Sequence, residues 1–247
     1  MDGTATTPAK LTAMHAAHRE LGAEFIYRDG WKLPARYSST DEEVSRAIEV
    51  GGVFDISPIG KLSFQGADVL TDLPRALALP ESLAVGRAIR YPSPTASEDS
   101  RESVTVAALT YDQAMVLTSP GSRDSVAAAL QDLLEGYAHM IDMTSGWAGI
   151  GALGPQVGDA LARIVEIDLD PDVLTDGACA QAKAAEVHSL IVRGDVSAHY
   201  ACQLYVTRDY GEYVWEALLH AGKGIGVGAI GIEAFERISG DSPGIPW

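Results

Sequence analysis

Residues 102–118 read ESVTVAALTYDQAMVLT, and residues 119–137 continue as SPGSRDSVAAALQDLLEGY. The first stretch holds two apolar runs, 102–109 and 114–118, separated by a short polar turn, which is the pattern of a β-hairpin. The second stretch spaces its apolar residues as an amphipathic helix does, and we expect that helix over 122–137. Two strands that follow one another directly, before a long helix, predict antiparallel pairing and not a βαβ unit.

The rest of the chain mixes strands and helices in the same irregular way. Residues 23–37 predict a short strand that folds back through a turn, and the oxygens of Ser38 to Asp41 predict the start of a helix that ends at Gly51. A first helix is expected from Leu11 onward. Further strands are expected at 61–65, 140–153, 186–193 and 202–207, and further helices at 67–77, 155–164, 208–221 and 231–238. The fold class predicted is α+β with mostly antiparallel sheets.

Composition and charge exclude several classes of protein. The chain has 247 residues, of which 47% are hydrophobic and 21% charged, so it is long and apolar enough for a substantial core. Its 18 Lys and Arg stand against 34 Asp and Glu, a net charge of −16 without any basic run, which excludes nucleic acid and anionic membrane as partners. The start, MDGTATTPAK, lacks the pattern of a secretory signal, and we expect a cytoplasmic protein.

Two short motifs match known sites only in part. Residues 226–231 (GVGAIG) match a dinucleotide-binding loop but lack an acidic residue about 20 positions later, so close packing of two helices explains the glycines better. Asp168, Asp170 and Asp172 alternate like the start of a calcium loop, but the sixth position is Val173 where glycine is needed. The two cysteines stand outside any CxxC pattern, and we expect no metal site.

Several stretches resemble, in this order along the chain, the glycine-cleavage T-protein family, the aminomethyltransferases that bind tetrahydrofolate. They are residues 11–15 (LTAMH), 29–37 (DGWKLPARY), 51–57 (GGVFDIS), 62–68 (LSFQGAD), 202–206 (CQLYV) and 213–222 (YVWEALLHAG). Residues 177–181 (GACAQ) are similar to part of the small gamma subunit of heterotetrameric sarcosine oxidase, a relative with the same fold.

The resemblance implies a folate-binding α+β scaffold of ferredoxin-like subdomains. We expect this fold over residues 11–240, as two intertwined subdomains, with a flexible tail at 1–10 and a C-terminal tail at 241–247. The family's C-terminal barrel domain would follow near Arg237, and we expect it to be lacking.

The family's catalytic carboxylate has no counterpart at the position that the resemblance assigns to it. An Asn-Asp pair should fall near Ala78-Leu79 or Leu79-Pro80, where no side chain can exchange a proton. Asp72 or Glu81 could fill the role from a shifted loop. His199 and Tyr200, at the mouth of the implied pocket, are further candidates for proton transfer.

The positions implied to recognise the pterin are also altered. The family's strand Y-T-G-E-x-G-(F/Y)-E corresponds to residues 196–203, so Val196 replaces its tyrosine and Gln203 its last glutamate. An amide offers one acceptor and one donor group, where a carboxylate accepts two hydrogen bonds. The other positions that the resemblance assigns to the pocket are Tyr91, Ile59 and Glu233. Glu233 reverses the charge of the family's arginine, although Arg87, Arg90 and Arg237 could form a local basic pocket.

The function predicted is that of a diverged T-protein-like chain in one-carbon or N-methyl-amine metabolism. It would be an accessory or altered subunit of a multi-chain amine-oxidising or demethylating complex, with a flavoprotein or sister subunits as partners and a small molecule in the folate-type pocket. A self-sufficient aminomethyl- or methyltransferase with tetrahydrofolate as cofactor is the first alternative. A different small-molecule enzyme on the same fold is the second.

Overall fold

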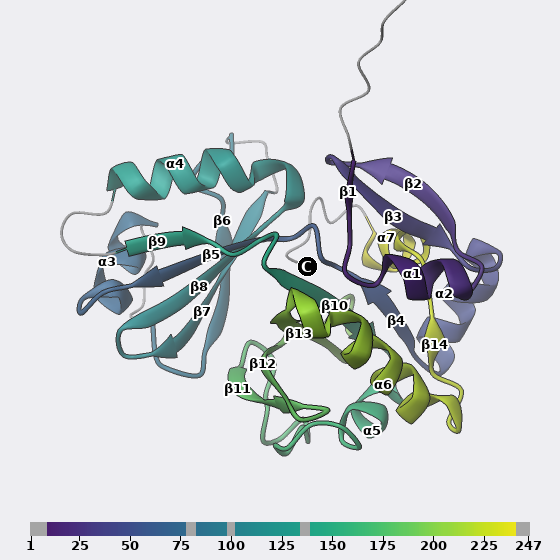
Figure 1. The fold of residues 1–247 in the computed structure, drawn as a ribbon. Coiled ribbons are helices and arrows are strands. Elements are labelled where there is room, and N and C mark those ends of the chain that lie inside the picture. Colours follow the sequence, from purple (N-terminus) through teal and green to yellow (C-terminus); the bar gives the residue numbers. More distant parts are fainter. Residues whose placement is uncertain (1–8, 78–82, 98–101, 134–138, 241–247) are drawn as a thin grey trace, which may run out of the picture.

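The computed structural model describes residues 9–77, 83–97, 102–133 and 139–240 of the chain (Figure 1). Its central sheet contains, from one edge to the other, β11 (Cys179–Ala184), β12 (Val187–Arg193), β13 (Ala201–Thr207), β10 (Trp147–Leu153), β4 (Gly52–Asp55) and β14 (Gly228–Ala229). Neighbouring strands in this sheet are antiparallel, apart from the parallel pair of β14 and β4.

A second sheet forms the other lobe of the molecule. Its order is β6 (Ala88–Pro92), β7 (Ser103–Thr110), β8 (Gln113–Thr118), β5 (Gly60–Gln65) and β9 (His139–Asp142), all antiparallel. The chain enters this lobe after β4 and returns to the central sheet at β10, although β4 and β10 are direct neighbours, with Ile150 opposite Asp55. The second lobe is therefore an insertion between two adjacent strands of the central sheet.

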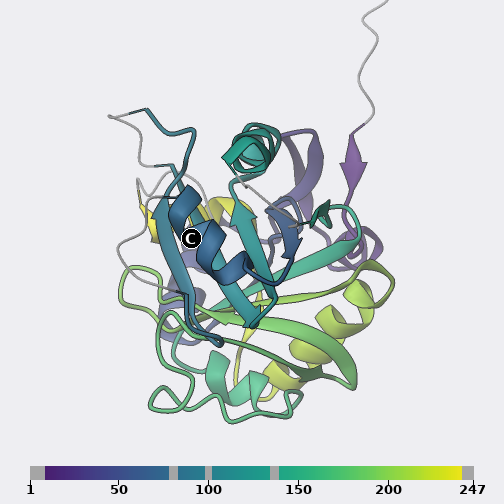
Figure 2. The same ribbon diagram turned by 90° about the vertical axis from the view of Figure 1, so that its left-hand side faces the viewer.

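Helices cover the outer faces of both sheets. Helices α3 (Val69–Ala76) and α4 (Arg123–Leu133) pack on the second sheet. In Figure 2, α3 lies in front and α4 is seen end-on above it. Helices α1 (His15–Glu20), α5 (Val157–Leu161) and α6 (Gly211–Lys223) cover the central sheet. Side chains alternate accordingly: Val116 faces the helices while Met115 and Leu117 join the core between the two sheets.

The N-terminal part adds a small sheet of β1 (Lys10–Leu11), β3 (Trp31–Arg36) and β2 (Glu24–Arg28) beside α2 (Thr40–Glu49) and α7 (Ile232–Ser239). Asp29 and Gly30 both have positive φ, 49° and 77°, in the two-residue turn between β2 and β3. Ser39 and Glu42 form a capping box at the start of α2. Short 3-10 turns precede α4 and α6, at Pro120–Ser122 and Arg208–Tyr210. The α+β class with mostly antiparallel sheets, predicted from the sequence, is confirmed.

The structure differs from the sequence-based expectations at several places. Residues 140–153 form two strands in different sheets, because the chain turns sharply where Thr144 N–H donates to Asp142 Oδ1. Leu11 lies in a strand, and the first helix begins at His15. Gly231 allows a close approach to a strand and not to a second helix: a Cβ there would lie 1.8 Å from the carbonyl oxygen of Ala35.

In the part of the chain that the structure describes, no helix is both long and apolar enough to span a lipid bilayer.

Candidate ligand-binding site

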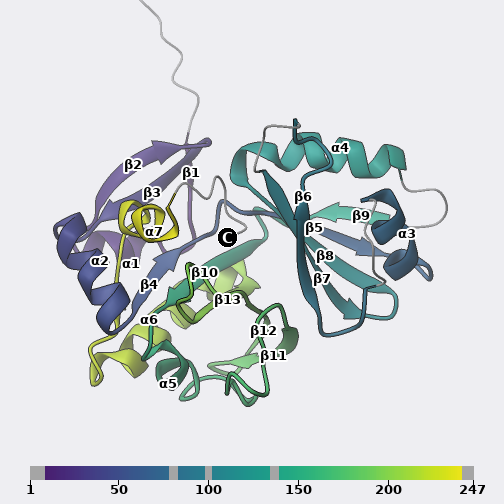
Figure 3. The same cartoon turned by 180° about the vertical axis from the view of Figure 1, so that it is seen from behind.

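A cavity of about 380 Å³ lies where the edge of the second sheet meets the central sheet. Its walls come from β6 and β7 on one side and from β12 and β13 on the other, and Figure 3 shows these two pairs of strands beside one another. This volume lies within the usual range for small-molecule sites. The charged and amide side chains among its lining residues are Arg87, Arg90, Asp176, Arg193, Asp195 and Gln203.

Backbone hydrogen bonds between the two lobes fix the walls of this cavity. Ala88 N–H donates to Gly177 O and Cys179 N–H donates to Gly86 O, both at 2.8 Å. Gly177 has a φ of +72°, a conformation that favours glycine. Cys179 is buried beside this junction, and burial raises the pKa of its thiol to about 12, so the sulfur stays protonated at neutral pH.

Arg193 is fully occupied by partners inside the protein. Its Nε and Nη2 donate to the two carboxylate oxygens of Asp195, each at 3.1 Å, and its Nη1 donates to Leu174 O at 2.8 Å. The Asp195 backbone N–H in turn donates to Asp176 Oδ1 at 2.9 Å. Both aspartates of the cavity wall are therefore engaged in holding the wall together.

Arg87 and Arg90 bind neutral groups. Arg87 Nη1 donates to Thr175 Oγ1 at 3.3 Å, and Arg90 Nε donates to Ser103 Oγ at 2.7 Å. Among the described residues neither guanidinium has an ion-pair partner, and burial lowers the pKa of Arg90. Two positive charges thus border the cavity without a carboxylate partner from the described part of the chain.

Gln203 is the polar group at the inner end of the cavity. The residue is completely buried, and its Oε1 accepts a short hydrogen bond from the hydroxyl of Tyr205, two residues along β13. Its Nε2 has no partner among the described residues. A buried amide N–H without a partner costs free energy, which binding of an acceptor would recover.

Lys61 lies behind this pair. Its ammonium group is 5.7 Å from the centre of the Tyr205 ring and donates to Ser57 O and Ile59 O, each at 2.8 Å. The side chain is fully buried, and burial lowers its pKa to about 7.

The structure places the residues that the T-protein resemblance assigned to the pocket in different environments. Gln203 lines the cavity. Ile59 and Val196 are buried in the core between the two sheets. Tyr91 follows Arg90 on β6 and packs against the core under α3 and α4. Glu233 lies on α7, where it accepts from Thr40 Oγ1 at 3.1 Å and pairs with Arg36 at 3.5 Å.

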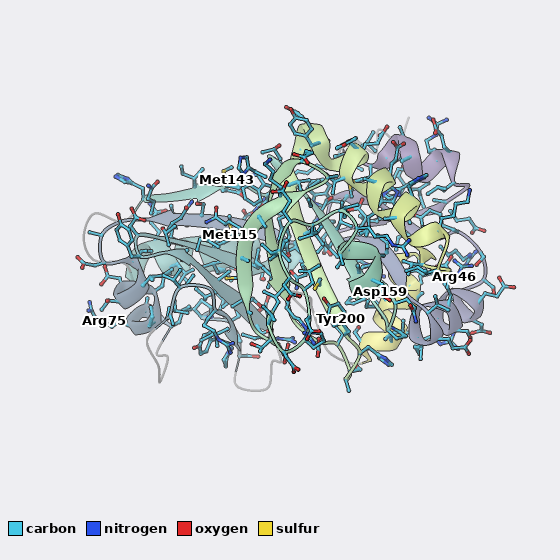
Figure 4. All side chains as sticks on the ribbon, turned by 90° about the horizontal axis from the view of Figure 1, so that it is seen from below. Arg46, Arg75, Met115, Met143, Asp159 and Tyr200 are labelled. Carbon is cyan, nitrogen blue, oxygen red and sulfur yellow. The ribbon has the colours of Figure 1, made fainter. Side chains whose placement is uncertain are left out.

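The candidates for proton transfer also lie apart. Asp72 pairs with Arg75 on α3 at 3.2 Å, and Figure 4 shows Arg75 at one end of the molecule, far from Tyr200. Glu81 and the positions 78–80 lie outside the described residues. Tyr200 donates to Leu169 O, its ring packs 4.3 Å from the Arg193 guanidinium carbon, and burial raises its pKa.

His199 belongs to the tight turn between β12 and β13, where its backbone pairs with that of Val196. The two turn residues, Ser197 and Ala198, have φ values of 48° and 68°. Neither His199 nor Tyr200 is among the residues that line the cavity.

Two of the three arginines expected to form a basic pocket, Arg87 and Arg90, line the cavity, whereas Arg237 pairs with Asp41 at 2.5 Å. Sequence reasoning did not find Arg193 or Asp195. The available signal was an arginine at the end of an apolar strand, followed two residues later by an acid.

Comparison with known protein families assigns the chain to one family. The family model described as the GCVT N-terminal domain matches residues 14–240, so the chain belongs to this family, which is the T-protein family that the sequence motifs predicted.

The curated relatives are longer than this chain. The aminomethyltransferase of Halothermothrix orenii is 24% identical over 231 residues, which cover 93% of this chain and 64% of the relative. The aminomethyltransferase of Streptomyces coelicolor is 29% identical over 237 residues, or 94% of this chain and 63% of the relative. The chain therefore spans somewhat under two thirds of the length of these proteins.

Two solved structures share the fold. The glycine cleavage system aminomethyltransferase T from Bartonella henselae matches with a TM-score of 0.77 at 19% identity, covering 93% of this chain and 62% of that one. A chain of the heterotetrameric sarcosine oxidase from Corynebacterium sp. U-96 matches with a TM-score of 0.61 at 14% identity, covering 76% of this chain and 92% of that one. At these identities the likeness shows the fold alone.

Proposed function

We propose that this chain is a ligand-binding subunit of a multi-chain enzyme that oxidises or demethylates N-methyl-amines in one-carbon metabolism. On its own it does not transfer a one-carbon group. The observation that carries this proposal is that the cavity offers positive charge and hydrogen-bond donors, while both of its described carboxylates, Asp176 and Asp195, already accept hydrogen bonds within the wall.

The chemistry of the lining residues supports a role in binding and not in catalysis. General acid or base catalysis needs a carboxylate, imidazole or similar group that can reach the substrate. Asp195 holds Arg193 through two hydrogen bonds, and Asp176 holds the backbone of Asp195. An arginine stays protonated at any working pH and an amide does not titrate, so neither exchanges protons with a substrate.

The kind of assembly is supported by the similarity to a chain of a heterotetrameric sarcosine oxidase, which extends over 92% of that chain. A chain that binds a ligand but lacks a reactive group needs partners that supply the reaction. We expect these to be a flavoprotein or sister subunits.

Tetrahydrofolate is the cofactor that the T-protein resemblance implies, and the cavity does not fit the edge of its pterin. The 2-amino group and N3–H of that edge are donors, which need acceptors in the protein. The amide oxygen of Gln203 already accepts from Tyr205, and the free group of this side chain is its N–H₂ donor. No reaction step through folate is derived from these residues.

A self-sufficient aminomethyltransferase is the second candidate. It is favoured by the 24–29% identity with curated aminomethyltransferases over more than nine tenths of this chain.

Turnover by the isolated chain separates the two functions. The purified protein would be incubated with tetrahydrofolate and an aminomethylated lipoyl donor, and the ammonia and 5,10-methylenetetrahydrofolate released would be measured. A full-length aminomethyltransferase serves as the positive control. We expect no product above the enzyme-free blank, and product formation by this chain would contradict the subunit proposal and support the transferase.

A further inference from the structure

We infer that the cavity binds the carboxylate group of an organic acid and discriminates against a pterin edge. The inference deepens the proposed function and rests on it in one respect, namely that this cavity is the ligand site of the subunit.

The hydrogen-bonding group of Gln203 that has no described partner is a donor. A buried phenol must donate its proton, and Gln203 Oε1 is the acceptor that the described residues provide for the Tyr205 hydroxyl. Turning the amide around would leave that hydroxyl proton without a partner. The free group of the amide is therefore Nε2, and of the described buried side-chain atoms without a partner it is the one whose residue lines this cavity.

Arginine side chains give the cavity wall positive charge. Of the three cavity arginines, Arg193 is neutralised by Asp195, while the described partners of Arg87 and Arg90 are hydroxyl groups. Asp176 is the remaining acid in the wall, and its Oδ1 already accepts a backbone N–H. The protein as a whole carries a net charge of −16, whereas the cavity wall holds three arginines against two aspartates, so the described wall is positive locally.

The planar geometry of a carboxylate matches the donors of the cavity. A carboxylate has two oxygens in one plane, and it accepts paired hydrogen bonds from a guanidinium or from an amide N–H₂. A cavity of about 380 Å³ accommodates a small acid with one or two carboxylates. The same chemistry is offered by a free acid and by the glutamate tail of a larger ligand.

Binding measured by calorimetry on the whole chain tests the inference with three probes. Glutarate carries carboxylates alone, p-aminobenzoyl-glutamate carries the tail found in folates, and 6-methylpterin carries the pterin edge alone. We expect the two carboxylate probes to bind, more weakly at high salt because the attraction is between charges, and 6-methylpterin not to bind. Binding of p-aminobenzoyl-glutamate without glutarate would assign the carboxylate to a larger ligand and still support the inference.

Substitutions locate the binding in this cavity. Arg90→Gln removes one charged donor and should weaken the binding of the carboxylate probe roughly tenfold. Arg75→Gln is the matched control, because Arg75 lies on α3, 68% exposed, at the far end of the molecule (Figure 4). Gln203→Glu replaces the donor by acceptors, and it should abolish glutarate binding and allow 6-methylpterin to bind.

Several results would overturn the inference. These are tighter binding of 6-methylpterin than of either carboxylate probe by the wild type, no binding of any probe, or equal effects of Arg90→Gln and Arg75→Gln. If circular dichroism shows that Gln203→Glu does not fold, the comparison of Arg90→Gln with Arg75→Gln still tests whether the probe binds in this cavity. The binding measurements reject the carboxylate inference if no carboxylate probe binds. The turnover assay rejects the subunit role if the isolated chain forms product, so the two hypotheses fail on different results.

Discussion

The molecule buries two polar clusters that differ in how completely their atoms find partners. Between α1, α6 and the central sheet, His18 Nε2 lies 2.9 Å from Asp55 Oδ2, and His18 Nδ1 lies 2.8 Å from the Tyr37 hydroxyl. Asp55 Oδ1 also accepts from Ser57 N–H at 2.8 Å. The histidine and the aspartate are both buried from solvent. This cluster is closed, and each of these polar atoms is paired within the protein.

The cluster around Gln203 is open. It borders a cavity, and within the described ranges Gln203 Nε2 has no hydrogen-bond partner and two guanidinium groups have no carboxylate partner. A closed network stabilises the fold, whereas an open one with unmet donors is suited to a ligand. The two clusters thus differ in whether their polar atoms are paired, and this difference separates a structural role from a binding role.

Lys61 connects the two clusters. Its Nζ donates to the carbonyl oxygen of Ser57, and the backbone N–H of Ser57 donates to Asp55. Its Nζ also lies near the ring of Tyr205, whose hydroxyl donates to Gln203. Substitutions in the closed cluster, at Lys61 and in the open cluster should therefore differ in their effects on stability.

The largest effect is expected from His18→Ala. It leaves the carboxylate of Asp55 buried without its main partner, and the pKa of Asp55 is held below its usual value partly by that histidine. We expect a loss of about 3–5 kcal/mol in the free energy of unfolding, measured by urea denaturation. His220→Ala, on the exposed side of α6, is the control, and equal losses for the two variants would show that the closed cluster does not stabilise the fold.

A large and pH-dependent effect is expected for Lys61. Its pKa is about 7 in the folded protein and 10.5 in its unperturbed state, so between these values the unfolded chain binds the additional proton. Stability therefore rises with pH across this range and is lost as the pH falls toward 7.

The variant Lys61→Met removes this contribution. The unfolding free energy of the wild type minus that of the variant should increase by up to about 1.4 kcal/mol for each pH unit, compared at about pH 7.5 and about pH 9.5. Lys223→Met, at the exposed end of α6, should show no such slope. A flat difference for Lys61→Met as well would mean that the buried amine keeps its ordinary pKa.

A moderate effect is expected from Arg193→Ala, which breaks the paired part of the cavity wall. It removes the hydrogen bonds to Asp195 and to Leu174 O, and we expect a loss of about 2 kcal/mol in thermal or urea unfolding. Arg193→Lys keeps the charge but not the two parallel hydrogen bonds, and it should recover only part of the loss. Full recovery by lysine would show that charge alone matters at this position.

The smallest effect on stability is expected from Arg90→Gln, in the open part of the same wall. Its only described side-chain hydrogen bond is to Ser103, so unfolding should change by less than about 0.5 kcal/mol. Urea unfolding next to Arg193→Ala checks the order. A loss as large as that of Arg193→Ala would show that Arg90 serves the fold and not a ligand.

Local signals in the sequence were sufficient for much of the fold. The turn at Asp29 and Gly30 and the start of α2 were predictable because turn geometry and helix capping depend on neighbouring residues. The strands β6 and β11 were not expected, since Cys179–Ala184 alternates small and polar residues with little β preference. Their pairing depends on contacts with segments far along the chain.

The candidate site was predictable only in part. The family motif pointed to Gln203, which lines the cavity. Whether Oε1 or Nε2 of its side-chain amide is free depends on the orientation of Tyr205. Which arginines lack a carboxylate partner depends on how strands from the two lobes meet. These are spatial relations that spacing along the sequence does not reveal.

A crystal structure of the chain grown with glutarate would show directly whether the cavity binds a carboxylate. We expect a carboxylate of glutarate in the cavity, within hydrogen-bond distance of Gln203 Nε2 and of the Arg90 guanidinium, with the Tyr205 hydroxyl still bound to Gln203 Oε1. A cavity that stays empty with both glutarate and p-aminobenzoyl-glutamate, or a Gln203 amide turned so that its oxygen binds the ligand, would contradict it.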